Sequence, residues 1–194
     1  GSSVTFPTIG SISPSVIENT QTAVTITGTN FQSVPTVDAI NSSTGAIITA
    51  DSVAFTNATT IVATFTLSVD GTYYLRAENN DGLAVRSTNA LLTVSDAPAW
   101  TTAAGSLGSV AATGSVNFTV AATNATSFAK TSGSFPGGVS INAGTGVISG
   151  TESGSTEATT YTFTIRATDA QGQTADRQFT ITISHGASGG GQFN

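Results

Sequence analysis

Residues 73–82 read YYLRAENNDG and residues 163–172 read FTIRATDAQG, so one pattern occurs twice in the chain. In each copy, apolar and polar residues alternate up to a polar turn that a glycine closes, and a second alternating run follows. This arrangement is typical of a β-hairpin. Because one copy lies near the end of each half of the chain, the repeat predicts two domains of similar plan in tandem.

Short runs with the composition of strands recur along both halves, with turn residues between them. They alternate in polarity or are rich in β-branched residues, as half-buried strands require. No segment has the pattern of an amphipathic helix. The expected strands cover residues 24–27, 46–49, 60–67, 73–77 and 91–94 in the first half, and residues 116–120, 147–148, 161–167 and 179–183 in the second. The sequence therefore predicts an all-β protein made of two tandem immunoglobulin-like β-sandwiches.

The composition supports this fold class and excludes some functions. The chain has 194 residues, which is room for two domains of about 100 residues each. Charged residues make up only 8% of the chain, against roughly 25% in ordinary soluble domains. A net charge of −6 with five basic residues argues against binding to nucleic acid or to an anionic membrane surface. Cysteine is absent, which rules out disulfides and thiolate metal sites, and no apolar run is long enough for membrane insertion as a helix.

The stretch SDAPAW at residues 95–100 marks the boundary between the halves. Pro98 cannot donate to a strand ladder, and its position favours a short linker. The chain has no methionine, and Gly1-Ser2 resembles the remnant of a cleaved tag. We therefore expect a tag remnant or disordered start at residues 1–3, a first domain at 4–95, a linker at 96–99, a second domain at 100–185 and a flexible glycine-rich tail at 186–194.

The first half carries the motif of a known domain family. Residues 7–31 read PTIGSISPSVIENTQTAVTITGTNF, with an early Ile-Ser-Pro and then a Val-x-Ile-x-Gly-x-Asn-Phe strand and turn. Over about residues 4–95 the chain therefore resembles an IPT/TIG domain, which implies an immunoglobulin-like sandwich.

The second half carries a different set of motifs, in which Phe135 and Val139 stand where leucine is usual. They are Pro98-Ala99-Trp100, SGSFPGGVS at residues 132–140, TGVISGT at residues 145–151 and DAQGQTAD at residues 169–176. From Pro98 to Ser184 the chain resembles the immunoglobulin-like domains of bacterial surface proteins and phage virion proteins, which are related to the cadherin-like group. This resemblance implies a non-enzymatic unit on an exposed surface.

The glycine-rich stretch GGVSINAGTGVISG at residues 137–150 comes close to a dinucleotide-binding fingerprint through Gly144, Gly146 and Gly150. Such a site needs its glycines between a strand and the N-terminus of a helix, where free N–H groups hold the pyrophosphate. Here a run of strand length follows Gly146, and the only lysine, Lys130, lies outside the stretch. We expect these glycines to serve tight turns between short strands instead.

Candidate catalytic residues are few. His185, the one histidine, sits where the last expected strand gives way to the glycine-rich tail, whereas a catalytic imidazole must be held rigidly by a buried carboxylate. Most of the eleven acidic residues fall in turns such as Asp70-Gly71 and Asp81-Gly82. We therefore expect no catalytic site and no enzyme.

Calcium is the sharpest chemical possibility. Asp96 lies in the expected linker, Asp169 and Asp176 flank one hairpin, and the cadherin-like resemblance suggests ions between domains. Calcium needs six to eight oxygen ligands with several converging carboxylates, and the dense acidic motifs of calcium-binding cadherin repeats are absent. The three aspartates are therefore candidate calcium ligands or ordinary turn residues, and no other cofactor is expected.

Trp100, beside the linker, is the candidate ligand-binding residue. Its indole ring could stack on a sugar, or it could cap the second sandwich where the first strand of that domain enters.

These observations lead to two hypotheses about function. The first is a structural or interaction module of a phage virion, in a tail fibre, an appendage or a capsid decoration, acting as a spacer or host-contact unit on the virion surface. Its partners would be other virion proteins, copies of itself paired through exposed edge strands, or host surface glycans. The alternative is a carbohydrate-binding or adhesin module of a bacterial cell-surface protein. Low charge and absent cysteine fit both, and the virion comes from the family resemblance alone.

Overall fold

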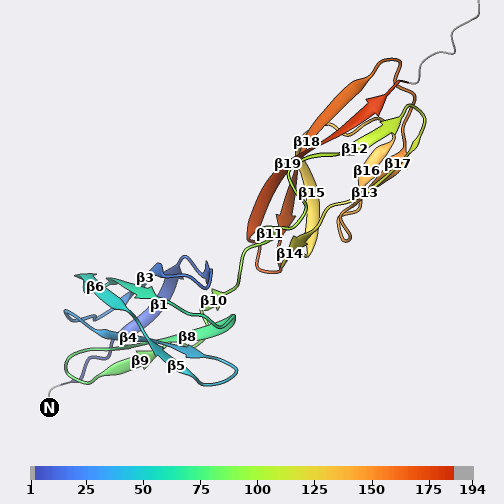
Figure 1. Ribbon diagram of the computed structural model, residues 1–194. Coiled ribbons are helices and arrows are strands. Elements are labelled where there is room, and N and C mark those ends of the chain that lie inside the picture. Colours follow the sequence, from blue (N-terminus) through green and yellow to red (C-terminus); the bar gives the residue numbers. More distant parts are fainter. Residues whose placement is uncertain (1–2, 186–194) are drawn as a thin grey trace, which may run out of the picture. The chain divides into compact units, whose positions relative to one another are not determined.

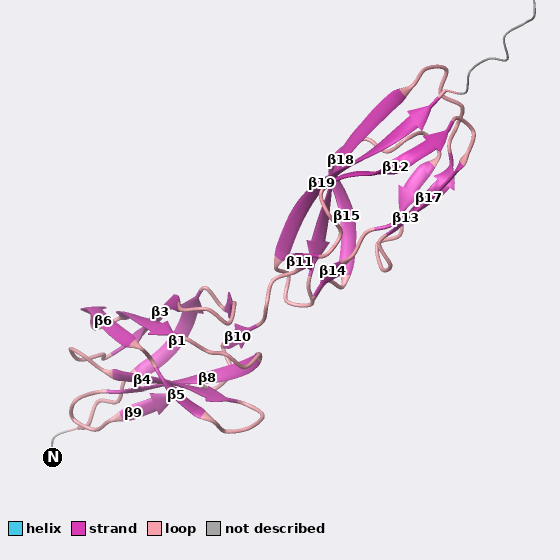
Figure 2. Ribbon diagram, viewed as in Figure 1, coloured by secondary structure: helices cyan, strands magenta, loops and turns pink. Residues whose placement is uncertain are grey.

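The computed structural model describes residues 3–185, and in that range every regular element is a β-strand (Figure 1, Figure 2). Residues 1–2 of the tag remnant expected at residues 1–3, and the tail expected at residues 186–194, lie outside the described residues. The chain divides into two compact units between Asp96 and Ala97. The predicted all-β architecture of two tandem immunoglobulin-like sandwiches is confirmed.

The first unit is a sandwich of two sheets. One sheet has the strand order β1-β3-β7-β6, and the other has the order β2-β10-β8-β4-β5, with β9 paired to β8 beside β10. Figure 1 shows β4, β5, β8 and β9 together in one layer and β1, β3 and β6 in the other. The strands are β1 (Thr8–Ser13), β2 (Val16–Ile17), β3 (Thr22–Thr29), β4 (Thr36–Asn41), β5 (Ile47–Thr49), β6 (Ser52–Asn57), β7 (Thr60–Phe65), β8 (Gly71–Glu78), β9 (Ala84–Arg86) and β10 (Leu92–Val94).

The second unit is also a sandwich. Its larger sheet has the order β12-β19-β18-β15, its smaller sheet has the order β13-β17-β16, and β11 pairs with β14. The strands are β11 (Ala99–Trp100), β12 (Gly105–Ala111), β13 (Ser115–Thr119), β14 (Ala122–Thr123), β15 (Ser127–Gly133), β16 (Val139–Ile141), β17 (Val147–Thr151), β18 (Thr159–Thr168) and β19 (Thr174–Ser184).

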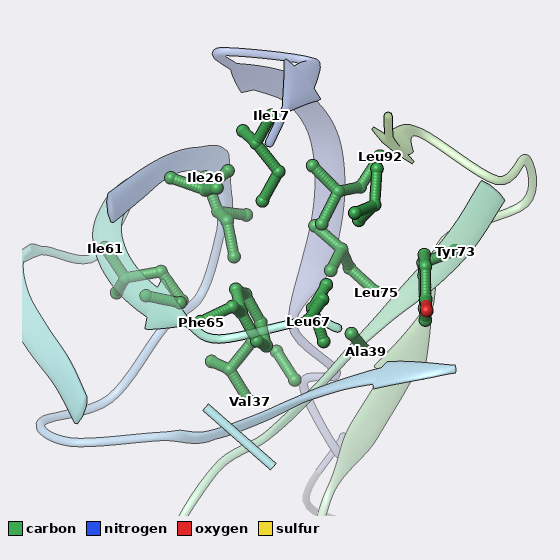
Figure 3. Packing of buried hydrophobic residues seen from close by; sticks show 14 of the residues in the cluster. Ile17, Ile26, Val37, Ala39, Ile61, Phe65, Leu67, Tyr73, Leu75 and Leu92 are labelled. Atoms are coloured by element: carbon green, nitrogen blue, oxygen red, sulfur yellow. The ribbon is translucent and has the colours of Figure 1, made fainter. Parts of the chain in front are cut away.

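Strict alternation along the strands builds the core of the first unit (Figure 3). In β8, Tyr73 and Leu75 are buried while Tyr74 lies on the outer face, as the alternating pattern predicts. Each fully buried aliphatic or aromatic side chain stabilises the fold by about 1.5–3 kcal/mol. The other labelled side chains that meet in this core are Ile17, Ile26, Val37, Ala39, Ile61, Phe65, Leu67 and Leu92.

The core of the second unit is organised around aromatic rings. Phe163 and Phe179, on adjacent strands, are almost fully buried, and their ring centroids lie 6.4 Å apart. Phe135 packs edge-on against Phe163 at 4.7 Å. Phe135 and Val139, which stand where the related domains have leucine, both pack against this core, so the exchange keeps an apolar contact.

The repeated hairpins adopt the same turn. In the first unit, the N–H of Asn79 donates to the carbonyl of Leu83, and the N–H of Gly82 donates to the carbonyl of Asn79. In the second unit the bonds recur from Asp169 to Gln173 and from Gly172 to Asp169. The closing glycines have φ angles of 84° and 85°, a left-handed conformation that favours glycine. The hairpins predicted from the repeat are confirmed.

Candidate functional site

The glycine-rich stretch at residues 137–150 forms the hairpin of β16 and β17. The side-chain Oδ1 of Asn142 accepts hydrogen bonds from the N–H groups of Gly144 and Thr145, at 3.0 and 3.1 Å. Gly146, with φ 75°, closes this turn by donating its N–H to the Asn142 carbonyl. The chain then enters β17, so the prediction that a strand follows these glycines is confirmed.

Gly150 has a different role from the one the sequence predicts. It lies inside β17 rather than in a turn, and a Cβ atom placed on it would stand 2.0 Å from the carbonyl oxygen of Gly138. The expectation that these glycines serve turns is therefore correct for Gly146 and wrong for Gly150. Gly150 lets β16 approach β17 closely, which is a packing requirement and not a ligand site.

The same turn occurs in the first unit, and the sequence analysis missed it. The Oδ1 of Asn41 accepts from the N–H groups of Ser43 and Thr44, and Gly45, with φ 75°, donates to the Asn41 carbonyl. The signal was present as Ile-Asn-x-x-Thr-Gly at residues 40–45 and again at residues 141–146. These turns are self-contained, because the asparagine amide oxygen is used by the backbone of its own loop.

The three candidate calcium ligands are used in separate ways. Asp96 closes the first unit, whereas Asp169 and Asp176 belong to the second. Asp169 is buried, and its carboxylate accepts from the backbone N–H groups of Gln171 and Gln173 and from the Gln173 side chain, at 2.8–3.0 Å. Among residues 3–185, no group of three or more His, Asp or Glu side chains is placed to hold a metal ion. The structure therefore uses Asp169 to hold the hairpin turn.

Asp176 forms a two-pronged ion pair with Arg166 across β18 and β19. Its two oxygens accept from Arg166 Nε and Nη2 at 2.9 and 3.0 Å. The hydrogen bonds to Arg166 lower the pKa of the Asp176 carboxyl, and the same contact raises the pKa of Arg166. This carboxylate is committed to its neighbour on the outer face of the sheet.

Trp100 is built into the second sandwich. Its indole N–H donates to the carbonyl oxygen of Ala175 at 3.1 Å, and its ring packs against Phe128 and Phe179 with centroid separations of 5.7 and 5.3 Å. The side chain is half-buried. Both the polar and the apolar parts of the tryptophan are therefore engaged inside its own domain.

Glu152 is a buried carboxylate that the sequence did not single out. It accepts hydrogen bonds from the N–H groups of Thr113, Gly154 and Ser155 and from the Ser155 hydroxyl. These bonds, led by the one from the Ser155 hydroxyl, lower the pKa of Glu152 to about 2 even though burial opposes the charge. The charged carboxylate clamps the turn before β13 to the loop after β17.

In each domain an early strand runs parallel to the last strand. In the first domain β2 pairs with β10 over two residue pairs, with the Thr93 N–H donating to the Ser15 carbonyl at 2.8 Å. In the second domain β12 pairs with β19 over six residue pairs, from Gly105 opposite Phe179 to Ala111 opposite Ser184. The described residues enclose no pocket, and His185 is exposed immediately after β19.

The two core-filled sandwiches, with their terminal strands paired and their polar groups committed to turns and strands, define a tandem immunoglobulin-like protein. The model of the IPT/TIG domain matches residues 7–95, so the first domain is similar to that family. The model of the Putative Ig domain matches residues 126–184, which lie within the second domain. Domains of these kinds are typically extracellular interaction or adhesion modules and are typically non-catalytic. No helix in the described part of the chain is long and apolar enough to span a membrane.

Solved structures that match this chain include several immunoglobulin and cadherin proteins. The I-band fragment I67–I69 from titin matches with a TM-score of 0.47 and 11% identity, over 94% of this chain and 67% of that one. The DIP-gamma IG1+IG2 structure matches with a TM-score of 0.39 and 12% identity, over 94% and 99%. The protocadherin GammaB4 extracellular domain matches with a TM-score of 0.37 and 13% identity over 93% of this chain. The match covers 34% of the length of that protocadherin chain. No curated protein matches the sequence.

Proposed function

We propose that the chain is a non-enzymatic structural module of a phage virion, in a tail fibre, an appendage or a capsid decoration, where it acts as a spacer or host-contact unit. The parallel pairing of early and last strands in each domain supports the spacer role. When the ends of such a domain are pulled apart, the two strands must slide past each other. All the hydrogen bonds between them are then loaded together in shear, rather than one after another.

The outer faces of the second domain suit an exposed particle surface. On the face formed by β18 and β19, Thr160 lies beside Thr182 with their hydroxyls 3.1 Å apart, and Thr162 lies opposite Thr180. The charges of Arg166 and Asp176 on this face neutralise each other in an ion pair. The neutral hydroxyls of such a face bind water, and the face carries little net charge.

Force spectroscopy on single molecules of the whole chain tests the spacer role. We expect two unfolding events, with the second domain unfolding at the higher force because six residue pairs join β12 to β19 and only two join β2 to β10. Thr93→Pro removes the N–H that donates to Ser15, so it should lower the force of the first event and leave the second unchanged. Equal forces for the two domains, or a Thr93→Pro chain that unfolds like the parent, would contradict the shear argument.

The virion assignment has its own test. If the coding sequence lies between tail and capsid genes, the proposal is supported. If it lies among genes for cell-wall anchoring or adhesin export, the alternative of a bacterial surface adhesin takes its place. Trp100 is engaged inside its domain, so its ring is not free to stack on a sugar. Glycan binding on an array should accordingly be compared between the parent chain and a Trp100→Phe chain, which keeps an aromatic ring at this position.

A further inference from the structure

One outer sheet face of the first domain combines exposed apolar and charged side chains, and we call it the Tyr74 face. It is formed by β5, β4, β8 and β9 (Figure 1). Strand register places Ile47, Ile40 and Tyr74 in one row across β5, β4 and β8. The neighbouring row carries charged side chains from β4, β8 and β9. The Tyr74 face consists of Asp38, Ile40, Ile47, Tyr74, Arg76, Glu78 and Arg86.

The row of Ile47, Ile40 and Tyr74 exposes apolar surface beside a cation. Ile47 is 65% exposed although it lies in a paired strand. The guanidinium of Arg86 lies over the Tyr74 ring, 4.2 Å from its centroid. Single exposed apolar side chains are common on protein surfaces. Tyrosine and arginine together, next to an exposed aliphatic side chain, are the residues that dominate protein–protein interfaces.

The charges of this face are balanced, but one of them has no opposite charge beside it. Arg76 lies 3.8 Å from Asp38 and 3.3 Å from Glu78. Arg86 stands directly opposite Arg76 across β8 and β9, and it forms no ion pair with any described residue. Like charges directly opposite each other destabilise a strand pair. A carboxylate from a partner molecule would relieve this contact.

The corresponding sheet of the second domain provides a comparison within the same chain. Its outer face carries threonine hydroxyls, and its arginine, Arg166, is fully paired with Asp176. That face has no exposed large apolar side chain and no open cation among the described residues. The features of the Tyr74 face are therefore particular to the first domain.

We propose that two copies of this chain associate through their Tyr74 faces about a two-fold axis. A two-fold contact requires a self-complementary patch, because each copy presents the same residues. Although the whole chain carries a net charge of −6, this face combines Arg76 and Arg86 with Asp38 and Glu78, so two copies meet without net repulsion. Glu78 of one copy then pairs with Arg86 of the other, and the apolar rows pack together. This deepens the interaction role proposed above by naming a second copy as the partner.

Sedimentation velocity over a concentration series, from about 1 µM to about 1 mM, measures the association, since weak contacts fall in that range. We expect the sedimentation coefficient of the parent chain to rise with concentration toward that of a dimer. Ile47→Glu and Arg86→Glu should each weaken the dimer by about tenfold or more. Thr162→Glu, on the hydroxyl face of the second domain, is the matched control and should leave association within about twofold of the parent. Circular dichroism melting of each whole-chain variant verifies that both domains are folded.

A charge exchange tests the partner directly. The Arg86→Glu chain has only carboxylates at positions 78 and 86, and the Glu78→Arg chain has only guanidiniums there, so each alone should be monomeric. An equimolar mixture of the two should associate, because every cross-contact then joins opposite charges.

The proposal is overturned by a sedimentation coefficient that stays constant throughout, by association that survives both Ile47→Glu and Arg86→Glu, or by a mixture that stays monomeric. None of these results bears on the unfolding forces of the single domains, so the spacer proposal stands or falls separately.

Discussion

Replacing Gly150 by alanine should destabilise the second domain strongly, because two separate costs fall on one residue. In β17 this glycine has a φ of 146°, a region that side-chain-bearing residues occupy at a cost of about 1–3 kcal/mol. A Cβ atom there would lie 2.0 Å from the carbonyl oxygen of Gly138 and 3.1 Å from Cα of Val139. Strand β16 must therefore move away from β17, and such overpacking costs a further ~1–3 kcal/mol.

The net effect follows from these terms. The lower entropy of alanine in the unfolded chain returns about 0.4–1 kcal/mol, which leaves a loss of about 3 kcal/mol of unfolding free energy. For a domain of this size, each kcal/mol corresponds to roughly 4–8 °C in Tm. Gly150→Ala should therefore lower the Tm of the second domain by about 12–24 °C.

Gly172→Ala is the matched control for the backbone term. This glycine closes the β18–β19 turn with φ 85°, and a Cβ atom on it meets nothing within 4 Å. Only the left-handed backbone, at about 1–2 kcal/mol, opposes the substitution. After the same entropy return of about 0.4–1 kcal/mol, a net loss of about 0.5–1 kcal/mol remains, so the Tm should fall by roughly 2–8 °C.

Differential scanning calorimetry of the whole chain measures both variants, with the transition of the first domain as an internal reference. If Gly150→Ala and Gly172→Ala lower the Tm equally, the close approach of β16 and β17 is not the reason for glycine at position 150.

Three further predictions concern other residues of the second domain. Because the pKa of Glu152 is lowered to about 2 from 4.5, its contribution to stability is complete above pH 4.5 and is lost as the pH falls toward 2. The Tm of the parent should thus fall over that window more than the Tm of Glu152→Gln, and parallel profiles would contradict the clamp. Chemical denaturation should show that Trp100→Ala lowers the free energy of unfolding by about 3 kcal/mol and Trp100→Phe by about 1 kcal/mol. Equal losses would show that the ring contacts do not stabilise the domain. Melting curves recorded with EDTA and with excess Ca²⁺ should superimpose, since Asp169 and Asp176 are committed to a turn and to Arg166; a Tm raised by Ca²⁺ would restore calcium as a ligand.

The sequence predicted the strands whose own residues favour β structure. Each of the nine expected runs overlaps a strand of the structure, among them β7, β8, β18 and β19, although the expected run at residues 60–67 extends two residues beyond β7. Two of the missed strands are held by pairing rather than by composition. Residues 105–111 (GSLGSVA) and 127–133 (SFAKTSG) are rich in glycine, serine and alanine, yet they form β12 and β15 at the two edges of one sheet. Strand preference depends on packing against neighbours, so tertiary partners decide such segments.

Candidate sites were harder to predict because their meaning depends on distant residues. The carboxylate of Glu152 is explained by an N–H of Thr113, 39 residues earlier in the chain. Arg86 gains its significance from Tyr74 and Arg76 on the adjacent strand. Asp169 and Asp176 were rightly placed on one hairpin, but alternation along the strand could not show that each already had partners.

The two internal repeats carry different information about this fold. The hairpin repeat occupies the same place in both domains. The hairpin of β8 and β9 and the hairpin of β18 and β19 each belong to the sheet that contains the last strand of their domain. The Ile-Asn-x-x-Thr-Gly repeat does not, because its first copy joins β4 to β5 beside β8 and its second joins β16 to β17 beside β13, in the opposite sheet. The second repeat therefore reflects local turn chemistry, in which one asparagine oxygen accepts two N–H groups and a left-handed glycine ends the turn. Two copies of one six-residue pattern can thus connect strands in different sheets. Only a motif that lies within a matching strand order indicates a shared domain plan.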